Sequence, residues 1–217
     1  MIVIGGLILS YLLLNRERML TTVDRCDYPL SDMEKLGVVT IIVPTLNEAA
    51  TIKQVLVDLE NQNVRVAYPE RFQVIVADSS DDETKEIASQ FDADIITVPL
   101  GKLTAIDTAI KYARGNIIVA ADADSRYGCN FLNLLLEHFQ DPSIVGVTGT
   151  GIYGKYPFLG VLRETAATIV PRMMGRGCAY RKEAYYTIGG FDLTIDQTSS
   201  RQMLLKKSLA SGGDWRK

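Results

Sequence analysis

Two aspartates, Asp122 and Asp124, stand one residue apart at the end of the apolar run 117–121 (IIVAA). Side chains alternate along a strand, so residues two apart point to the same side. At a strand end both carboxylates can therefore face one point in space. This arrangement suits a hard divalent cation such as Mg²⁺ or Mn²⁺, which takes oxygen ligands and usually shares them with substrate phosphates. Two aspartates at this spacing, taken alone, are more often solvated side chains at a strand end. The rest of the chain must therefore show whether they form a metal site.

The elements that would position these acids follow from the apolar periodicity. It predicts strands at 38–43, 73–77, 94–98, 117–121 and 143–150, and helical segments within 51–60, 79–91, 101–115 and 131–139. Strands that alternate with helices indicate a parallel sheet with helices on both faces. Ligands of such sheets bind outside the carboxyl ends of the strands. Asn47 and Glu48 follow the first strand and Asp78 follows the second, so we expect these residues to share one crevice with the two aspartates.

The residue types in this crevice fit a nucleotide-activated substrate. Asp78 and Glu48 can accept hydrogen bonds from base N–H groups and ribose hydroxyls. A metal on Asp124, shared with Asp122, can bridge phosphates and stabilise charge on a departing diphosphate. Lys102 can add positive charge there. Taken singly, each residue also has an ordinary structural explanation, such as helix capping by Asp78.

Size and composition set the outer limits. The chain has 217 residues, of which 47% are hydrophobic, and this fits one α/β domain with a sizeable core. A formal net charge of −3 argues against a broad nucleic-acid-binding surface. Three widely spaced cysteines predict neither a disulfide framework nor a zinc site, and fit a reducing compartment.

The N-terminal residues 1–14 carry no charge and are strongly apolar. As a helix they would reach about 21 Å, against roughly 30 Å of bilayer hydrocarbon. They predict a short membrane anchor or an interfacial helix, and the alternative is a hydrophobic helix packed on the domain or on a second copy. Arg16, Arg18 and Arg25 follow directly, so the positive-inside rule predicts a membrane-associated protein with its catalytic domain on the cytoplasmic side.

Four segments resemble, in the same order, the motifs of family-2 glycosyltransferases. They are TIIVPTLNEAATI (40–52), VIVADSSDDET (74–84), GKLTAIDTAIKYARGNIIVAADAD (101–124) and GRGCAYRKEAYYTIGGFD (175–192). The resemblance implies the α/β fold called GT-A, with a mostly parallel central sheet flanked by helices. It divides the chain into an anchor-like segment (1–14), a linker (15–37), a nucleotide-sugar-binding half (38–150) and a C-terminally short acceptor-side half (151–217).

The resemblance also implies an activity and a site. Members transfer a sugar from a nucleoside-diphosphate sugar with inversion and use Mg²⁺ or Mn²⁺. The acceptor is a saccharide, a protein or a lipid phosphate, and no nucleic acid is involved. The metal is expected on Asp124, shared with Asp122. The residues expected at the donor are Pro44, Asn47, Glu48, Asp78, Lys102, Asp122, Ala123 and Arg126.

The chain departs from the family pattern where the catalytic base is expected. Members usually carry Glu-Asp some way after the G-G-F-D motif, and here Asp196 is the nearest carboxylate, with Asp192 and Asp214 as weaker candidates. Asp196 is therefore predicted to deprotonate the acceptor hydroxyl. Two other functions stay open, namely an impaired transferase-like protein that binds sugar nucleotides and a haloacid-dehalogenase-like phosphatase. A nicotinamide dehydrogenase is poorly supported, because no G-x-G-x-x-G follows the first strand.

Overall fold

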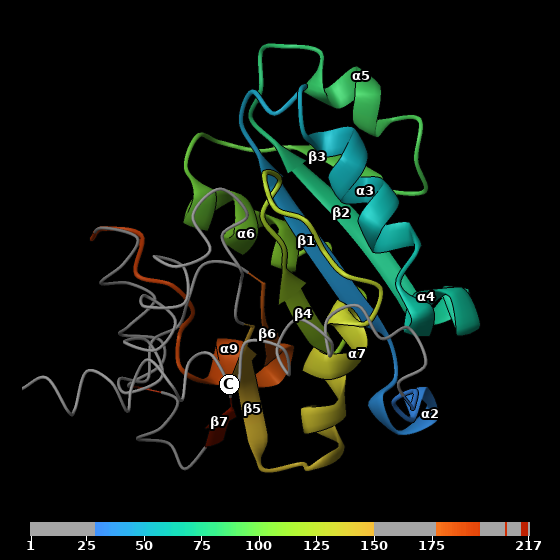
Figure 1. Ribbon diagram of the computed structural model, residues 1–217. Coiled ribbons are helices and arrows are strands. Elements are labelled where there is room, and N and C mark those ends of the chain that lie inside the picture. The colour runs from blue at the N-terminus through green and yellow to red at the C-terminus, as the bar shows by residue number, and fades with distance from the viewer. Residues whose placement is uncertain (1–28, 150–176, 196–206, 208–213, 217) are drawn as a thin grey trace, which may run out of the picture.

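The computed structural model describes residues 29–149, 177–195, 207 and 214–216. Within them seven strands form one sheet, in the order β3-β2-β1-β4-β6-β5-β7 (Figure 1). The strands are β1 (Val39–Thr45), β2 (Phe72–Asp78), β3 (Asp94–Thr97), β4 (Ile117–Ala120), β5 (Ile144–Thr148), β6 (Cys178–Arg181) and β7 (Asp214–Arg216). The anchor-like segment 1–14 lies outside the described residues.

The helices connect the strands and cover the sheet. They are α2 (Met33–Leu36), α3 (Ile52–Glu60), α4 (Asn63–Ala67), α5 (Thr84–Ala88), α6 (Lys102–Ile110), α7 (Phe131–Leu136) and α9 (Lys182–Thr187), with 3₁₀ turns at η1 (Pro69–Arg71) and η2 (Glu137–Gln140). No helix among the described residues has both the length and the apolar character needed to cross a bilayer.

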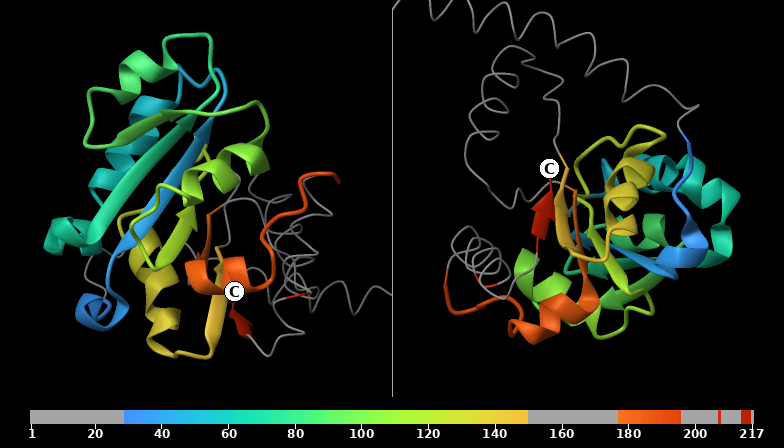
Figure 2. Two further views of the ribbon diagram at one scale, coloured as in Figure 1. Left: turned by 180° about the vertical axis from the view of Figure 1, so that it is seen from behind. Right: turned by 90° about the horizontal axis from the view of Figure 1, so that it is seen from below.

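Alternation along the central strands divides the core into two layers. Ile41 and Val43 of β1 pack in one cluster with the apolar faces of α3 and α7, whereas Ile42 packs in the other with α6 and β6. All three side chains are fully buried, which is typical of a parallel strand covered on both faces. The two helical layers on either side of the sheet are visible in Figure 2.

The sheet is mixed, and this decides where the site lies. β1 runs parallel to β2 and β4, and β2 runs parallel to β3. β6 lies antiparallel between β4 and β5, and β7 runs parallel to β5. The carboxyl ends of β1, β2, β3 and β4 therefore meet at one edge, which we call the carboxyl edge and which is uppermost in Figure 1. The predicted GT-A-like fold, with helices flanking a largely parallel sheet, is confirmed.

Two features differ from the sequence-based expectation. The end of the predicted linker forms α2, where Asp32 caps the helix and Met33 and Leu36 are buried in the core. The cysteines also differ, because Cys129 is disulfide-bonded while Cys178 is a buried thiol. The prediction of unpaired cysteines was therefore wrong at Cys129, since wide spacing in sequence says nothing about proximity in the fold.

Candidate active site

The site begins where β1 and β2 end side by side. Thr45 stands opposite Asp78 in the strand register, and its hydroxyl donates to Asp78 Oδ1 at 2.7 Å. The Ser80 amide donates to the same oxygen at 3.3 Å. Asp78 is only 3% exposed, so these two donors fix the orientation of a nearly buried carboxylate. No donor within the described part of the chain is assigned to its second oxygen, which can accept from a ligand.

The loop after β1 is held by the loop after β2. Three successive amides, those of Asn47, Glu48 and Ala49, donate to Ser80 Oγ, Thr84 Oγ1 and Asp82 Oδ2, at 2.9, 2.9 and 3.2 Å respectively. The Asn47 side-chain oxygen accepts in return from the Asp81 amide at 3.1 Å.

Asn47 has a φ of 57°, in the left-handed region that asparagine tolerates better than most residues. The Glu48 side chain accepts from the Thr51 hydroxyl at 2.9 Å. Asn47 and Glu48, both predicted at the donor, thus shape the loop at the carboxyl edge, and Pro44 lies within β1 just before them.

The first aspartate after β4 meets a lysine from α6. Lys102 Nζ lies 2.5 Å from Asp122 Oδ1, and the two side chains are 30% and 12% exposed. Gly101, at a φ of 119°, lets the chain turn into α6 so that Lys102 begins the helix at this edge. Ala123 is buried, which holds the backbone between the two aspartates against the core.

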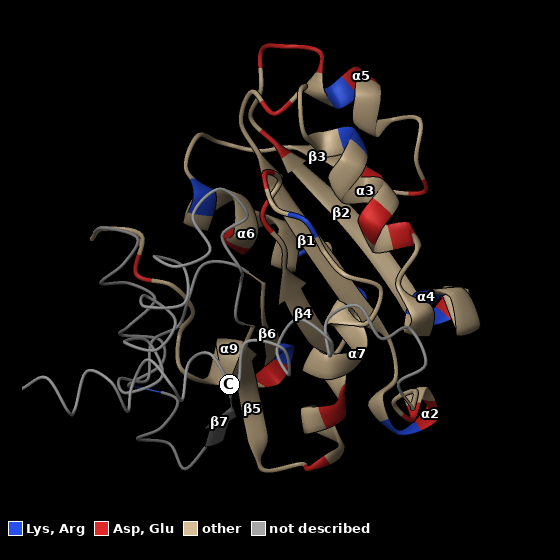
Figure 3. Cartoon of the chain, viewed as in Figure 1, with Lys and Arg blue, Asp and Glu red and all other residues tan. Residues whose placement is uncertain are grey.

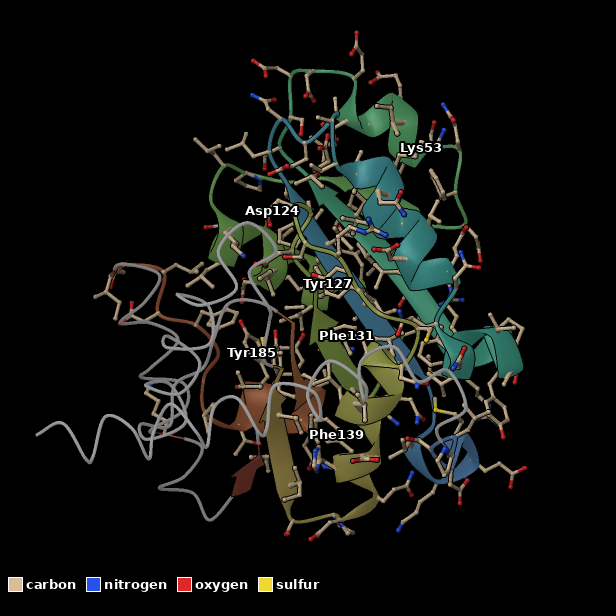
Figure 4. All side chains as sticks on the ribbon, in the orientation of Figure 1. Lys53, Asp124, Tyr127, Phe131, Phe139 and Tyr185 are labelled. Carbon is tan, nitrogen blue, oxygen red and sulfur yellow. The ribbon has the colours of Figure 1, made fainter. Side chains whose placement is uncertain are left out.

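Asp124 differs from Asp122 in its surroundings. Its side chain is exposed at the carboxyl edge, and no residue of the described chain forms a hydrogen bond or ion pair with it (Figure 4). Figure 3 shows acidic residues, in red, gathered around this end of the sheet, with a basic segment, in blue, on α6 nearby. Asp78 therefore lies at the same edge of the sheet as the Asp122–Lys102 ion pair, and Asp124 follows Asp122 by two residues.

The donor set fits a divalent cation shared with a ligand. Among the described residues no group of three or more His, Cys, Asp and Glu side chains lies close enough to hold a metal ion by itself. Asp122 and Asp124 offer carboxylate oxygens, the ligand type that Mg²⁺ and Mn²⁺ prefer, and such ions commonly complete their shell with phosphates and water. The arrangement therefore suits a cation that binds together with a diphosphate.

Arg126, predicted at the donor, is bound to α3. Its guanidinium donates to both oxygens of Asp58, from Nε at 2.6 Å and from Nη2 at 3.1 Å. The hydrogen bond and the charge of Asp58 raise the pKa of Arg126. Asp58 was not predicted as a functional residue from the sequence. It lies on α3 between the buried residues Val55 and Leu59, and an acid at such a position is a signal for a hydrogen-bond partner elsewhere in the fold.

The segment around α9 is bound to α6 through a tyrosine. The Tyr185 hydroxyl of α9 donates to Asp107 Oδ1 at 2.7 Å and accepts from the Phe191 amide at 3.2 Å. Burial, followed by the interactions with Asp107, raises the pKa of Tyr185, so this hydroxyl stays protonated as a donor. The chain after α9 then climbs towards the carboxyl edge (Figure 1).

The three candidates for the catalytic base differ in their positions and contacts. Asp192 Oδ1 accepts from the Thr194 hydroxyl at 2.5 Å and from the Thr194 amide at 3.0 Å, and these bonds lower the pKa of Asp192. Asp214 pairs in register with Ile144 at the beginning of β5, so it lies at the edge opposite to the carboxyl edge. Asp214 is therefore a poor candidate for the base, and Asp196 lies outside the described residues.

Replacing Thr45 by valine is expected to weaken nucleotide binding about tenfold, because a hydrogen bond to a charged group contributes about 1.5–3 kcal/mol. Valine keeps the shape of the side chain but removes the donor that orients Asp78. Calorimetric titration of the parent and of Thr45→Val with GDP or UDP and Mn²⁺ measures the effect.

Thr40→Val is the matched control for this measurement. The Thr40 hydroxyl donates to Gln73 at the other end of the same strand, so its loss costs stability without touching the site. Equal nucleotide dissociation constants for Thr45→Val and the parent would contradict the role of Thr45.

Comparison with known proteins agrees with this geometry. A model described as glycosyl transferase family 2 matches residues 40–191. The chain is 26% identical over 177 residues to a dolichyl-phosphate hexose transferase of Haloferax volcanii, covering 81% of this chain and 69% of that protein. It is 26% identical over 145 residues to a dolichol-phosphate mannosyltransferase of Pyrococcus furiosus, covering 62% of this chain and 40% of that protein.

A solved structure shares the fold. The mannosyltransferase PcManGT from Pyrobaculum calidifontis, solved in complex with GDP-Man and Mn²⁺, superimposes with a TM-score of 0.70 at 24% identity. The match covers 99% of this chain and 64% of that one, so the chain spans about two thirds of the length of this neighbour. Because the family model covers more than half of the residues, the chain belongs to glycosyl transferase family 2.

Proposed function

We propose that this chain transfers a sugar from a nucleoside-diphosphate sugar to an acceptor with inversion of the anomeric centre. The observation that carries the proposal is that the oriented carboxylate of Asp78 and the Asp122–Lys102 ion pair lie at the same carboxyl edge, with Asp124 exposed two residues after Asp122. Such an edge is where open α/β sheets bind their ligands. Family membership and the Mn²⁺ and GDP-Man of the structural neighbour support the same function.

Each residue has a distinct part in this proposal. Asp78, held by Thr45, accepts hydrogen bonds from the nucleoside. Asp124 and Asp122 would hold Mg²⁺ or Mn²⁺, which supplies positive charge against the diphosphate. Lys102 orients Asp122 through their ion pair and adds positive charge at the same point. The acceptor oxygen attacks the anomeric carbon, the bond to the diphosphate breaks, and the nucleoside diphosphate leaves with the electron pair.

The acceptor is proposed to be a lipid phosphate. The two curated relatives are named as transferases of dolichyl or dolichol phosphate, which supports this class. The apolar residues 1–14 would bring the site to a membrane surface. Deleting these residues is then expected to reduce partition of the protein onto phospholipid vesicles, and equal partition of both forms would count against the anchor.

A thermal-shift screen tests the donor and the metal together. Nucleoside-diphosphate sugars are tested with Mn²⁺, without it, and after addition of EDTA. A ligand present at 100 times its dissociation constant stabilises the folded state by about 2.7 kcal/mol, so binding raises the melting temperature by several degrees. We expect such a rise only when sugar nucleotide and Mn²⁺ are both present. A failure of every sugar nucleotide to shift the melting temperature would exclude the proposed donor class.

A further inference from the structure

We propose that Asp58 of α3 is a positioning residue for Asp124, because it ties the loop that carries Asp124 to the helix beside it. This inference rests on the proposed metal role of Asp124. Asp58 itself does not touch the ligand in the proposal. It acts through the backbone of the loop 122–127, which we call the aspartate loop.

The Asp58 carboxylate is unusually well satisfied for a helix residue. Its side chain is 9% exposed and accepts four hydrogen bonds. Two come from Arg126, one from the Tyr127 amide at 3.1 Å, and one from Gln54 Nε2 at 2.9 Å. Burial raises the pKa of Asp58, but these hydrogen bonds outweigh burial and lower the pKa overall, so the carboxylate stays charged. Three of the four donors belong to the aspartate loop.

Tyr127 connects the two ends of the aspartate loop. Its amide is bound to Asp58, while its hydroxyl donates to the backbone oxygen of Asp122 at 3.0 Å. The ring is 8% exposed and packs against Phe131 with centroids 4.6 Å apart (Figure 4). Asp124 therefore sits in a short loop whose two ends are fixed to each other through Tyr127 and to α3 through Asp58.

Further contacts fasten the next residues to the beginning of α4. The buried Gln62 side chain donates to the Gly128 oxygen at 2.8 Å and accepts from the Leu132 amide at 2.9 Å. The Asn63 amide donates to the Cys129 oxygen at 2.8 Å. These contacts hold the chain that enters α7, but they lie beyond the aspartate loop. Asp58 is the side chain from α3 that binds within the loop itself.

Because Asp124 is exposed, its orientation towards a metal needs a fixed loop backbone, which the hydrogen bonds of Asp58 provide. Within the described residues no hydrogen bond holds its carboxylate in place, so its orientation depends on the backbone alone. Residues that orient metal ligands without touching the metal commonly change metal affinity 10- to 100-fold when substituted. We expect a change of this size at Asp58, although its side chain lies outside the metal's own shell.

The experiment measures Mn²⁺ affinity separately from folding. Free Mn²⁺ is titrated by its electron paramagnetic resonance signal with saturating GDP and, separately, UDP, at a temperature well below the melting point of every variant. Asp58→Ala is expected to raise the Mn²⁺ dissociation constant about tenfold or more. Asp58→Asn removes the negative charge and the acceptor for Arg126 Nη2. Its remaining oxygen can still accept from the Tyr127 amide and Arg126 Nε, which share one oxygen of Asp58, so the loss of affinity is expected to be smaller.

Gln54→Ala is the matched control, because it removes a hydrogen bond from the same carboxylate without touching the loop. It is expected to leave the Mn²⁺ dissociation constant unchanged. Hydrogen–deuterium exchange gives a second readout, in which the amides of 122–127 exchange faster in Asp58→Ala and Asp58→Asn than in Gln54→Ala. If Asp58→Ala does not fold, Asp58→Asn carries both measurements.

The outcomes separate the inference from the function on which it rests. Parent-like Mn²⁺ affinity and loop exchange in Asp58→Ala, with binding lost in Asp124→Ala, would overturn only the role of Asp58. Parent-like affinity in Asp124→Ala would overturn the metal assignment itself. An equal loss of affinity in Gln54→Ala and Asp58→Ala would show that the effect does not act through the loop.

Discussion

Asp124→Ala is expected to abolish the Mn²⁺-dependent binding of a nucleoside diphosphate while leaving the ligand-free protein almost as stable as the parent. Asp124 is exposed and has no hydrogen-bond or ion-pair partner within the described residues, so its removal takes away no folding contact. Substitutions at such positions usually change stability by less than about 0.5 kcal/mol, which shifts the melting temperature by about 1–2 °C in a chain of this size.

Asp122→Ala provides the comparison, because the two neighbouring aspartates differ in their contacts. Asp122 is 12% exposed and forms an ion pair with Lys102, so its substitution by alanine removes that ion pair. Both stability and ligand binding should therefore fall in Asp122→Ala. Thermal unfolding with and without Mn²⁺ and GDP or UDP measures both effects. A parent-like Mn²⁺-dependent shift in Asp124→Ala would remove Asp124 from the metal site.

The sequence predicts the strand ends well because the signal there is local. The apolar runs predict strand ends at 43, 77 and 121, and the strands end at Thr45, Asp78 and Ala120. The parallel topology brings these ends to one edge. The polar residues that follow them could therefore be assigned to one crevice before any coordinates. The same reasoning located Lys102 at the beginning of a helix, although its approach to Asp122 depends on how α6 docks on the sheet.

The partners that hold the site could not be predicted, because they are distant in sequence. Asp58 meets Arg126 68 residues later, and Tyr185 meets Asp107 78 residues earlier. Periodicity within a window of ten or fifteen residues has no information on such pairs. It also cannot show that β6 enters antiparallel between β4 and β5, which places Asp214 at the wrong edge for a base.

The identity of the base leads to the second large effect. Asp196→Asn is expected to lower kcat by about 10²–10⁴ with a hydroxyl acceptor, because a general base typically contributes that much. Donor affinity should stay within about twofold, since a base acts on the acceptor and not on the nucleotide. Single-turnover transfer and calorimetric titration of the donor separate the two quantities.

Asp192→Asn is the matched variant, with the same chemical change four residues earlier. The side-chain and backbone hydrogen bonds from Thr194 lower the pKa of Asp192, so this carboxylate holds a proton less readily than an ordinary aspartate. A general base works best when its pKa is close to the working pH, and Asp192 is shifted away from it. Asp192→Asn should therefore reduce kcat far less than Asp196→Asn, and the reverse order would exchange their roles.

The expected effect of Asp196→Asn on the transfer rate depends on the class of acceptor. A hydroxyl must lose its proton as it attacks, whereas a phosphate monoester has its second pKa near 6 and is already an anion at neutral pH. With a polyprenyl phosphate as acceptor, transfer therefore needs no base, and Asp196→Asn should keep nearly the parent rate. A large loss of transfer to polyprenyl phosphate would instead mean that Asp196 acts in some way other than as a base.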